Sequence, residues 1–278
     1  MSLFGVFNYS KEGPGIEKNA PQKKAPIVFF ETFFRNIWKF ITVNLFCCLI
    51  SLPIVTTGLA KAGMTNVTRN TARDKHSFGV SDFMDTVKKN WKQTLALGII
   101  GLLAKAFCAF SLYFYYKNLG NGMLATLGFG VVLFVTFAVL IMDFYVWTLA
   151  ITFKLSVKQI IKNSFIFVFA NLFKNLLCGL VLIAVYAVYI GILFIVPYPI
   201  TLALELIIFV CTFPAFRFLL IQFCTFSAIK KNIIDPYYEQ HPDEDIELRR
   251  NLGLDVGDTE NTERDFEDTV NKTEEKAE

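Results

Sequence analysis

The sequence lacks the signatures of the common soluble enzymes. Its 278 residues contain no G-x-x-x-x-G-K-[ST], G-x-S-x-G or H-E-x-x-H pattern and no glycine-rich dinucleotide loop. The chain is therefore not itself an ATPase of the P-loop type. Histidine occurs only at His76 and His241, both in stretches that we predict to be loops, which excludes histidine-based proton transfer within a membrane. We predict a protein that is not an enzyme, with no catalytic residues and no cofactor.

No C-x-x-C pair is present among the six cysteines of the chain. No cysteine lies near either histidine in the sequence. The six cysteines all fall in apolar segments: Cys47, Cys48, Cys108, Cys178, Cys211 and Cys224. We predict that they are reduced side chains that pack as small apolar groups, and that the chain holds no metal. The first 25 residues contain no apolar core of the signal-peptide type, so we expect insertion to depend on the spans described next.

Long apolar runs dominate the chain, and 54% of the residues are hydrophobic. Four runs exceed the roughly 18 residues that mark a membrane-spanning helix, and they are Thr94–Tyr116, Leu124–Phe153, Leu176–Val196 and Ile200–Ile229. A fifth, Phe40–Leu59, has Pro53 near its end. Because hydrocarbon cannot satisfy free backbone groups, these runs must be helices. The sequence predicts an all-α, polytopic transmembrane helix bundle.

The number of crossings depends on Gly58–Arg73, a short and semi-polar segment. Small residues on it, such as Gly58 and Gly63, would let it pack closely as a return helix. If it crosses, every lysine- and arginine-rich connection falls on one side, which satisfies the positive-inside rule. We therefore favour six crossings in the cell (plasma) membrane with both termini cytoplasmic. The alternative is a cytoplasmic loop and five crossings.

Three amphipathic segments are predicted to lie at the cytoplasmic surface. Ile27–Lys39 would feed the first span, whereas Ser81–Gln93 and Ser156–Asn175 would each run into a later one. Ser81 and Ser156 are the predicted N-caps, and Ser156 forms a capping-box pattern with Gln159. The basic faces of these helices would lie on anionic lipid or dock a cytoplasmic partner.

Charge divides the chain into three predicted regions. Residues 1–26 form a polar N-terminal segment, and residues 27–234 form a single transmembrane domain. Residues 235–278 carry 16 acidic and 5 basic side chains, whereas residues 1–234 carry 8 acidic and 22 basic. We predict that the acidic tail is solvated and largely disordered. The basic excess next to the spans follows from membrane topology, so no nucleic-acid partner is implied.

Four charged residues fall within the predicted spans: Lys105, Asp143, Glu205 and Arg217. Counted from the inner lysines at about 1.5 Å per residue, Lys105, Asp143 and Arg217 all lie roughly 16–20 Å above the inner boundary. Glu205 lies nearer the outer face. An unpaired charge at mid-membrane costs at least about 2.5–3.5 kcal/mol, so we expect Asp143 to accept from Lys105, Arg217 or both. Such a group would be either a structural ion pair or a polar site for a solute or proton.

Two stretches resemble a known family. Leu3-Phe4-Gly5-Val6-Phe7-Asn8-Tyr9-Ser10-Lys11-Glu12-Gly13-Pro14-Gly15 and Lys18-Asn19-Ala20-Pro21 resemble the N-terminal signature of the YesL-like bacterial membrane proteins, whose biochemical function is unknown. Leu52-Pro53-Ile54-Val55-Thr56-Thr57-Gly58, Ser81-Asp82-Phe83 and Lys89-Asn90-Trp91-Lys92-Gln93 resemble their first hairpin and surface helix. Leu59 stands where the family commonly has proline.

The resemblance implies a role beside sugar uptake, because such proteins are typically encoded near carbohydrate ABC importers. We expect an accessory subunit of an oligosaccharide importer that contacts the permease and ATPase subunits as well as the lipid bilayer. The alternative is an independent transporter or channel with an intramembrane charged site. The candidate partner-contact residues are Phe4, Phe7, Tyr9, Trp91 and Lys92.

Overall fold

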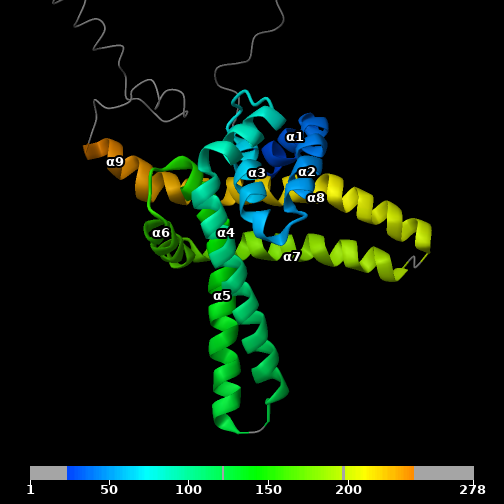
Figure 1. Cartoon of the computed structure of the whole chain (residues 1–278), viewed down its shortest axis with the longest axis vertical. Coiled ribbons are helices and arrows are strands. Elements are labelled where there is room, and N and C mark those ends of the chain that lie inside the picture. The colour runs from blue at the N-terminus through cyan, green and yellow to red at the C-terminus, as the bar shows by residue number, and fades with distance from the viewer. Residues whose placement is uncertain (1–23, 121, 196–197, 241–278) are drawn as a thin grey trace, which may run out of the picture.

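The computed structural model describes residues 24–240, except for residues 121 and 196–197, and these residues form helices and short connections without a β-strand. The helices are α1 (Ala25–Arg35), α2 (Ile37–Ser51), α3 (Thr57–Ala72), α4 (Val80–Lys117), α5 (Met123–Thr152), α6 (Val157–Ala170), α7 (Leu172–Ile195), α8 (Pro199–Ile229) and α9 (Asp235–Gln240). A 3₁₀ turn, Ile54–Thr56, precedes α3, and a π-helical turn, Lys230–Ile234, joins α8 to α9. Figure 1 shows α1, α2 and α3 lying close together, and we call these three helices, with the parts of α4, α5 and α8 that contact them, the body of the molecule.

Four described helices, α4, α5, α7 and α8, are long and apolar enough to cross a membrane. A fifth candidate exists if α1 and α2, which are bent by 74° at Asn36, are counted together. The prediction of an all-α polytopic fold is therefore confirmed. The predicted return helix forms as α3, which has 16 residues and is not among the span candidates.

The predicted span Phe40–Leu59 was wrong as a single helix. The helix α2 ends at Ser51, and the chain turns at Pro53, which cannot donate a backbone hydrogen bond. The Thr56 amide and hydroxyl both donate to the Pro53 carbonyl, at 3.0 and 2.8 Å, and the Thr57 hydroxyl donates to Ile54. These bonds fix a tight turn that sends α3 back beside α2, so Leu59 belongs to the return helix.

The return helix α3 is the centre of the body and contacts α2, α4, α5 and α8. Its glycines permit the closest approach. A Cβ atom on Gly58 would lie 2.3 Å from the Thr94 carbonyl oxygen and 2.8 Å from the Gly98 Cα of α4. A Cβ atom on Gly63 would lie 2.7 Å from the Phe83 ring. Small residues therefore set the α3–α4 distance, as predicted for this segment.

The first helix packs on α8 as well as lying at the surface. Phe29 and Phe33 are both buried, and each meets Phe216 edge-to-face at centroid distances of 5.2 and 5.6 Å. Phe29 also meets Phe223 in the same way at 5.6 Å. The helix ends at Arg35, so the predicted segment Ile27–Lys39 is divided between α1 and α2.

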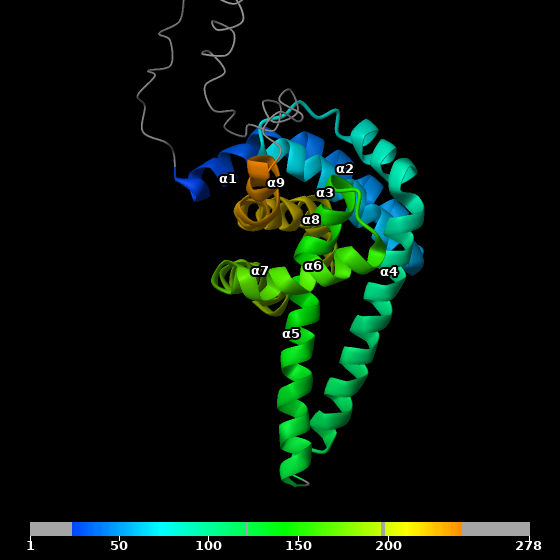
Figure 2. The ribbon, with the colours of Figure 1, turned by 90° about the vertical axis from the view of Figure 1, so that its left-hand side faces the viewer.

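Two long hairpins leave the body in different directions. The α4–α5 hairpin extends downward in Figure 1, while the α7–α8 hairpin extends to the right; Figure 2 shows the same divergence from another side. Their outer halves carry large exposed apolar side chains, including Phe107, Leu124, Phe194 and Leu206. Neither hairpin therefore covers the outer part of the other.

The other two predicted surface segments, Ser81–Gln93 and Ser156–Asn175, are helical, but they join their spans differently, and the second is divided between α6 and α7. Ser81–Gln93 continues without a break into α4, and its N-cap is Gly79, at φ 64°, so the prediction of Ser81 as the cap was wrong. Only glycine adopts this backbone conformation at little cost. Ser156 does cap α6: its side chain accepts from the Gln159 amide, and the Gln159 side chain accepts from the Ser156 amide.

A buried polar network holds the junction between α6 and α7. The Tyr145 hydroxyl on α5 donates to Asn175 Oδ1 at 2.6 Å and accepts from Asn171 Nδ2 at 3.2 Å. Asn175 Nδ2 in turn donates to the Phe167 and Val168 carbonyls at the end of α6. The Phe167 carbonyl also accepts from the Asn171 backbone N–H, so Asn175 adds a second donor there and supplies one to Val168 where the chain changes direction.

Candidate functional site: a charged cluster among four helices

Four charged side chains converge inside the body, and each comes from a different helix. Asp143 on α5 is the only acid among them, and its side chain is 9% exposed. Its carboxylate lies 3.3 Å from Lys61 Nζ of α3, 3.0 Å from Lys105 Nζ of α4 and 3.1 Å from Arg217 Nη2 of α8. The cluster therefore ties four helices together at one point.

The Asp143 carboxylate accepts a further hydrogen bond besides its contacts with the three cations. Trp147, one turn along α5, donates its indole N–H to Oδ1 at 3.1 Å. The Lys61 ammonium also lies 5.3 Å from the centroid of the Trp147 ring, within the range of a cation–π contact. Trp147 is itself buried, so this indole holds both the carboxylate and one of its cations in place.

The helix α8 carries a proline close to Arg217. Pro214 lies inside the helix three residues earlier, and proline removes one backbone donor from a helix. Asn44 of α2 donates its side-chain amide to the Cys211 carbonyl at 2.6 Å, so a neighbouring helix supplies a donor near this proline. Five residues beyond Arg217, Gln222 donates to the Thr148 hydroxyl of α5 at 2.9 Å.

The charges of the cluster do not balance. Three cations surround one carboxylate, so the four side chains carry two positive charges in excess when all are ionised. The side chains of Lys61, Lys105 and Arg217 are 23%, 32% and 27% exposed, more than that of Asp143. The cluster is thus a carboxylate enclosed by cations, and its outward-facing groups would attract an anion.

The structure brings together three of the four charges singled out from the sequence. Lys105, Asp143 and Arg217 meet, and the fourth, Glu205, lies apart on the outer part of α8. Both Glu205 carboxylate oxygens are buried and have no hydrogen-bond partner among the described residues. Glu205 instead lines an aromatic cavity between α7 and α8.

Sequence reasoning missed Lys61. Lys61 lies on Gly58–Arg73, a segment whose sequence fits either a return helix or a loop. The sequence therefore does not identify it as an intramembrane charge. Its neighbours Ala60, Ala62 and Gly63 are small and buried, and they place α3 within reach of α5. A lysine within a run of small residues is the sequence feature that could have indicated a buried charge in this segment.

The partner-contact candidates are only partly covered by the structure. Phe4, Phe7 and Tyr9 lie outside the described residues. Trp91 and Lys92 are exposed on α4, and the Lys92 ammonium lies 5.6 Å from the Trp91 ring centroid. They remain available to lipid or to another protein.

Basic residues also gather at the far end of α3. Arg35 of α1 forms an ion pair with Asp74, beside a polar cavity of about 490 Å³ that Lys75 and His76 also line. Burial and the neighbouring Arg69 lower the pKa of Arg73 to about 10, and the Arg73 guanidinium lies 4.2 Å from the Phe226 ring centroid. Within the described ranges no group of three or more histidines, cysteines or acids is placed to hold a metal.

The long apolar helices and the charges enclosed by them define a multi-pass helical membrane protein. Residues 36–112 match the protein family described as "Protein of unknown function, DUF624", which confirms the family resemblance over this segment. The segment covers α2, α3 and most of α4, so it includes Lys61 and Lys105, whereas Asp143 and Arg217 lie beyond it. No curated protein and no solved structure matches the chain.

Proposed function

We propose that the protein is a non-enzymatic accessory subunit of a carbohydrate ABC importer in the cell membrane. The resemblance of its N-terminal and first-hairpin motifs to the YesL-like proteins supplies the kind of partner. The structural observation that carries the proposal is the divergence of the two long hairpins, whose outer apolar faces no described part of the chain covers. Lipid or helices of other proteins must cover these faces.

The complete pairing of Asp143 within the charged cluster favours an accessory role over transport. Asp143 engages all three cations and the Trp147 indole, so the carboxylate is occupied by the protein itself. Contacts from four helices also oppose the relative movement that a transport cycle requires. Two long hairpins with exposed apolar side chains are suited to binding other membrane proteins.

Co-purification and uptake together test this proposal. Tagged protein is isolated in mild detergent from cells that also express a carbohydrate ABC importer. Mass spectrometry then quantifies the permease and ATPase subunits of that importer. A matched strain carries an unrelated multi-pass protein with the same tag. We expect both subunits to be enriched over the control, and deletion of the protein to lower oligosaccharide uptake while subunit abundance is retained. Equal recovery from both strains together with unchanged uptake would refute the accessory role.

A transporter for anions is the second candidate, and the excess of two positive charges at the cluster favours it. Purified protein reconstituted alone into vesicles would then carry an anion across the membrane, and Lys105→Met would reduce the flux. An accessory subunit gives no flux in the same vesicles. The two functions are thus separated by the activity of the isolated chain.

A further inference from the structure

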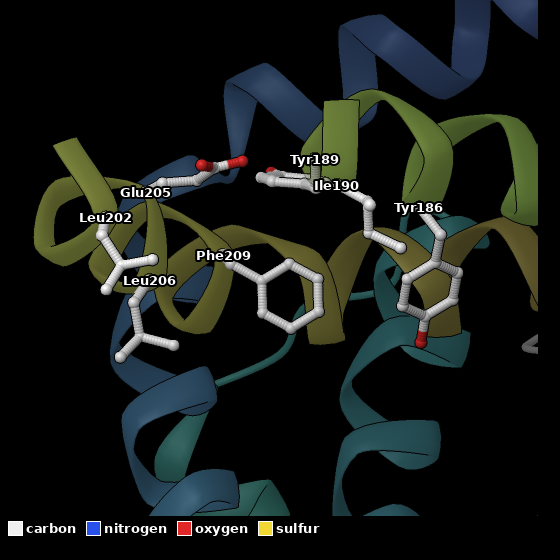
Figure 3. Close-up of a pocket in the computed structure, with 7 residues that line it drawn as sticks. All are labelled: Tyr186, Tyr189, Ile190, Leu202, Glu205, Leu206 and Phe209. Carbon is white, nitrogen blue, oxygen red and sulfur yellow. The ribbon is translucent and has the colours of Figure 1, made fainter. Parts of the chain in front are cut away.

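A cavity of about 410 Å³ lies between α7 and α8, well away from the charged cluster. Its lining is apolar apart from one carboxylate, and the residues are Tyr186, Tyr189, Ile190, Leu202, Glu205, Leu206 and Phe209. Figure 3 shows the Glu205 carboxylate on the Tyr189 side of this space, with the rings of Phe209 and Tyr186 farther along it. The cavity therefore combines one acid with three aromatic side chains.

Glu205 has no compensation from the described part of the chain. Both of its oxygens are buried, and neither has a hydrogen-bond partner among the described residues. A carboxylate in apolar surroundings is costly unless it is paired with a cation or is protonated. The nearest cation on the same helix is Arg217, three turns away and already engaged with Asp143.

The aromatic side chains are held in a fixed arrangement. Tyr189 meets Phe209 edge-to-face with centroids 5.0 Å apart, and Phe209 stacks on Phe213 at 4.6 Å. The Tyr189 hydroxyl is engaged with the Thr212 hydroxyl at 3.1 Å, which fixes the position of its ring. Aromatic faces attract cations through their quadrupole, and cages of such rings recognise quaternary ammonium groups.

We propose that this cavity binds an organic ammonium group, with Glu205 as its counter-ion and Tyr186, Tyr189 and Phe209 as its aromatic wall. A bare metal ion fits poorly, because Glu205 is the only acid among the lining residues and hard cations require several oxygen ligands. An ammonium group with alkyl substituents places its charge near the carboxylate and its methyl or methylene groups against the apolar wall. The inference goes beyond the proposed function and does not depend on it.

Calorimetric titration of the full-length protein in detergent tests this assignment, with choline as the quaternary ammonium probe. Its neutral isostere 3,3-dimethyl-1-butanol is titrated in parallel, and sodium chloride controls for ionic strength. We expect saturable binding of choline and at least tenfold weaker binding of the isostere. Glu205→Gln should weaken choline binding at least tenfold, and Phe209→Leu should weaken it severalfold.

Two controls keep the result interpretable. Asp85→Asn removes an acid from the cytoplasmic end of α4, far from the cavity, and should bind choline as the unaltered protein does. Thermal unfolding and gel filtration identify any variant that is misfolded, and the isostere comparison on the unaltered protein does not depend on variants. Absence of saturable choline binding, equal binding of the neutral isostere, or unchanged binding by folded Glu205→Gln would each overturn the proposal.

Discussion

The ammonium of Lys61 lies 3.3 Å from Oδ2 of Asp143, although 82 residues separate them in the chain. This contact ties the short return helix to the first long hairpin. Because Lys105 and Arg217 share the same carboxylate, Asp143 is the one acid on which the positions of four helices depend. The consequences of removing it and of removing one of its cations should therefore differ.

Asp143→Asn should destabilise the protein more than Lys105→Met. The first change leaves three cations close together without an anion, whereas the second leaves a carboxylate with two cations. Breaking a buried pair on one side costs about 3–5 kcal/mol, and we expect Asp143→Asn to reach this range and Lys105→Met to stay below it. Thermal unfolding in detergent and abundance in membranes measure both.

The control for this comparison is Lys117→Met, at the exposed end of α4, which should leave the melting temperature unchanged. Combining Asp143→Asn with Lys105→Met should restore part of the stability, because one uncompensated cation is then removed. An Asp143→Asn protein as stable as Lys117→Met, but with altered transport in vesicles, would instead favour a solute site.

The meeting of Lys105, Asp143 and Arg217 could be predicted, because helix rise converts residue spacing into an expected depth and opposite charges at equal depth should pair. That argument works only for segments already identified as spans. Lys61 escaped it because α3 is too polar to be recognised by hydropathy, and its burial arises from packing against four other helices. The position of Glu205 nearer the outer face stays a prediction, and the aromatic cavity around it depends on how α7 meets α8, which no local pattern specifies.

Gly58→Ala should disrupt the contact between α3 and α4. The new methyl group would lie 2.3 Å from a backbone oxygen of α4, so the helices themselves would have to separate. Overpacking of this kind typically costs about 1–3 kcal/mol. Gly101→Ala is a matched control on α4, since nothing lies within 4 Å of its added Cβ. Thermal unfolding should show a lower melting temperature for the first variant, and an equal or higher one for the second. The same melting temperature for both would contradict the close approach.

Tyr145→Phe should loosen the junction between α6 and α7. It removes the donor to Asn175 Oδ1 and the acceptor for Asn171 Nδ2 while retaining the ring. Leaving a buried polar group unsatisfied costs about 1–3 kcal/mol. Tyr113→Phe, at an exposed site on α4, is the control and should be neutral. Hydrogen exchange should be faster at Asn171 to Asn175 in the first variant alone, and unchanged exchange there would show that the network is dispensable.

Ser156→Ala and Ser81→Ala should differ although the two serines look alike in sequence. Ser156 caps α6 through its side chain, so its loss should cost about 1 kcal/mol. Ser81 lies inside α4, and Gly79, whose backbone has a positive φ, is the N-cap. The residue pattern alone did not predict this cap. Hydrogen exchange of the first α6 turn should increase for Ser156→Ala, and the first α4 turn should be unaffected by Ser81→Ala. Equal effects at both sites would contradict the assignment of the caps.

The orientation of the chain can be tested at the two ends of the first long hairpin. Lys117 lies at the tip between α4 and α5, whereas Lys158 lies on α6, beyond the opposite end of α5. Lysines are concentrated around Lys158 and scarce around Lys117, so the positive-inside rule predicts that Lys158 is cytoplasmic. In a background without native cysteines, a membrane-impermeant maleimide added to intact cells should label Lys117→Cys and should label Lys158→Cys only after permeabilisation. Labelling of Lys158→Cys from outside would reverse the proposed topology and place both termini on the other side of the membrane.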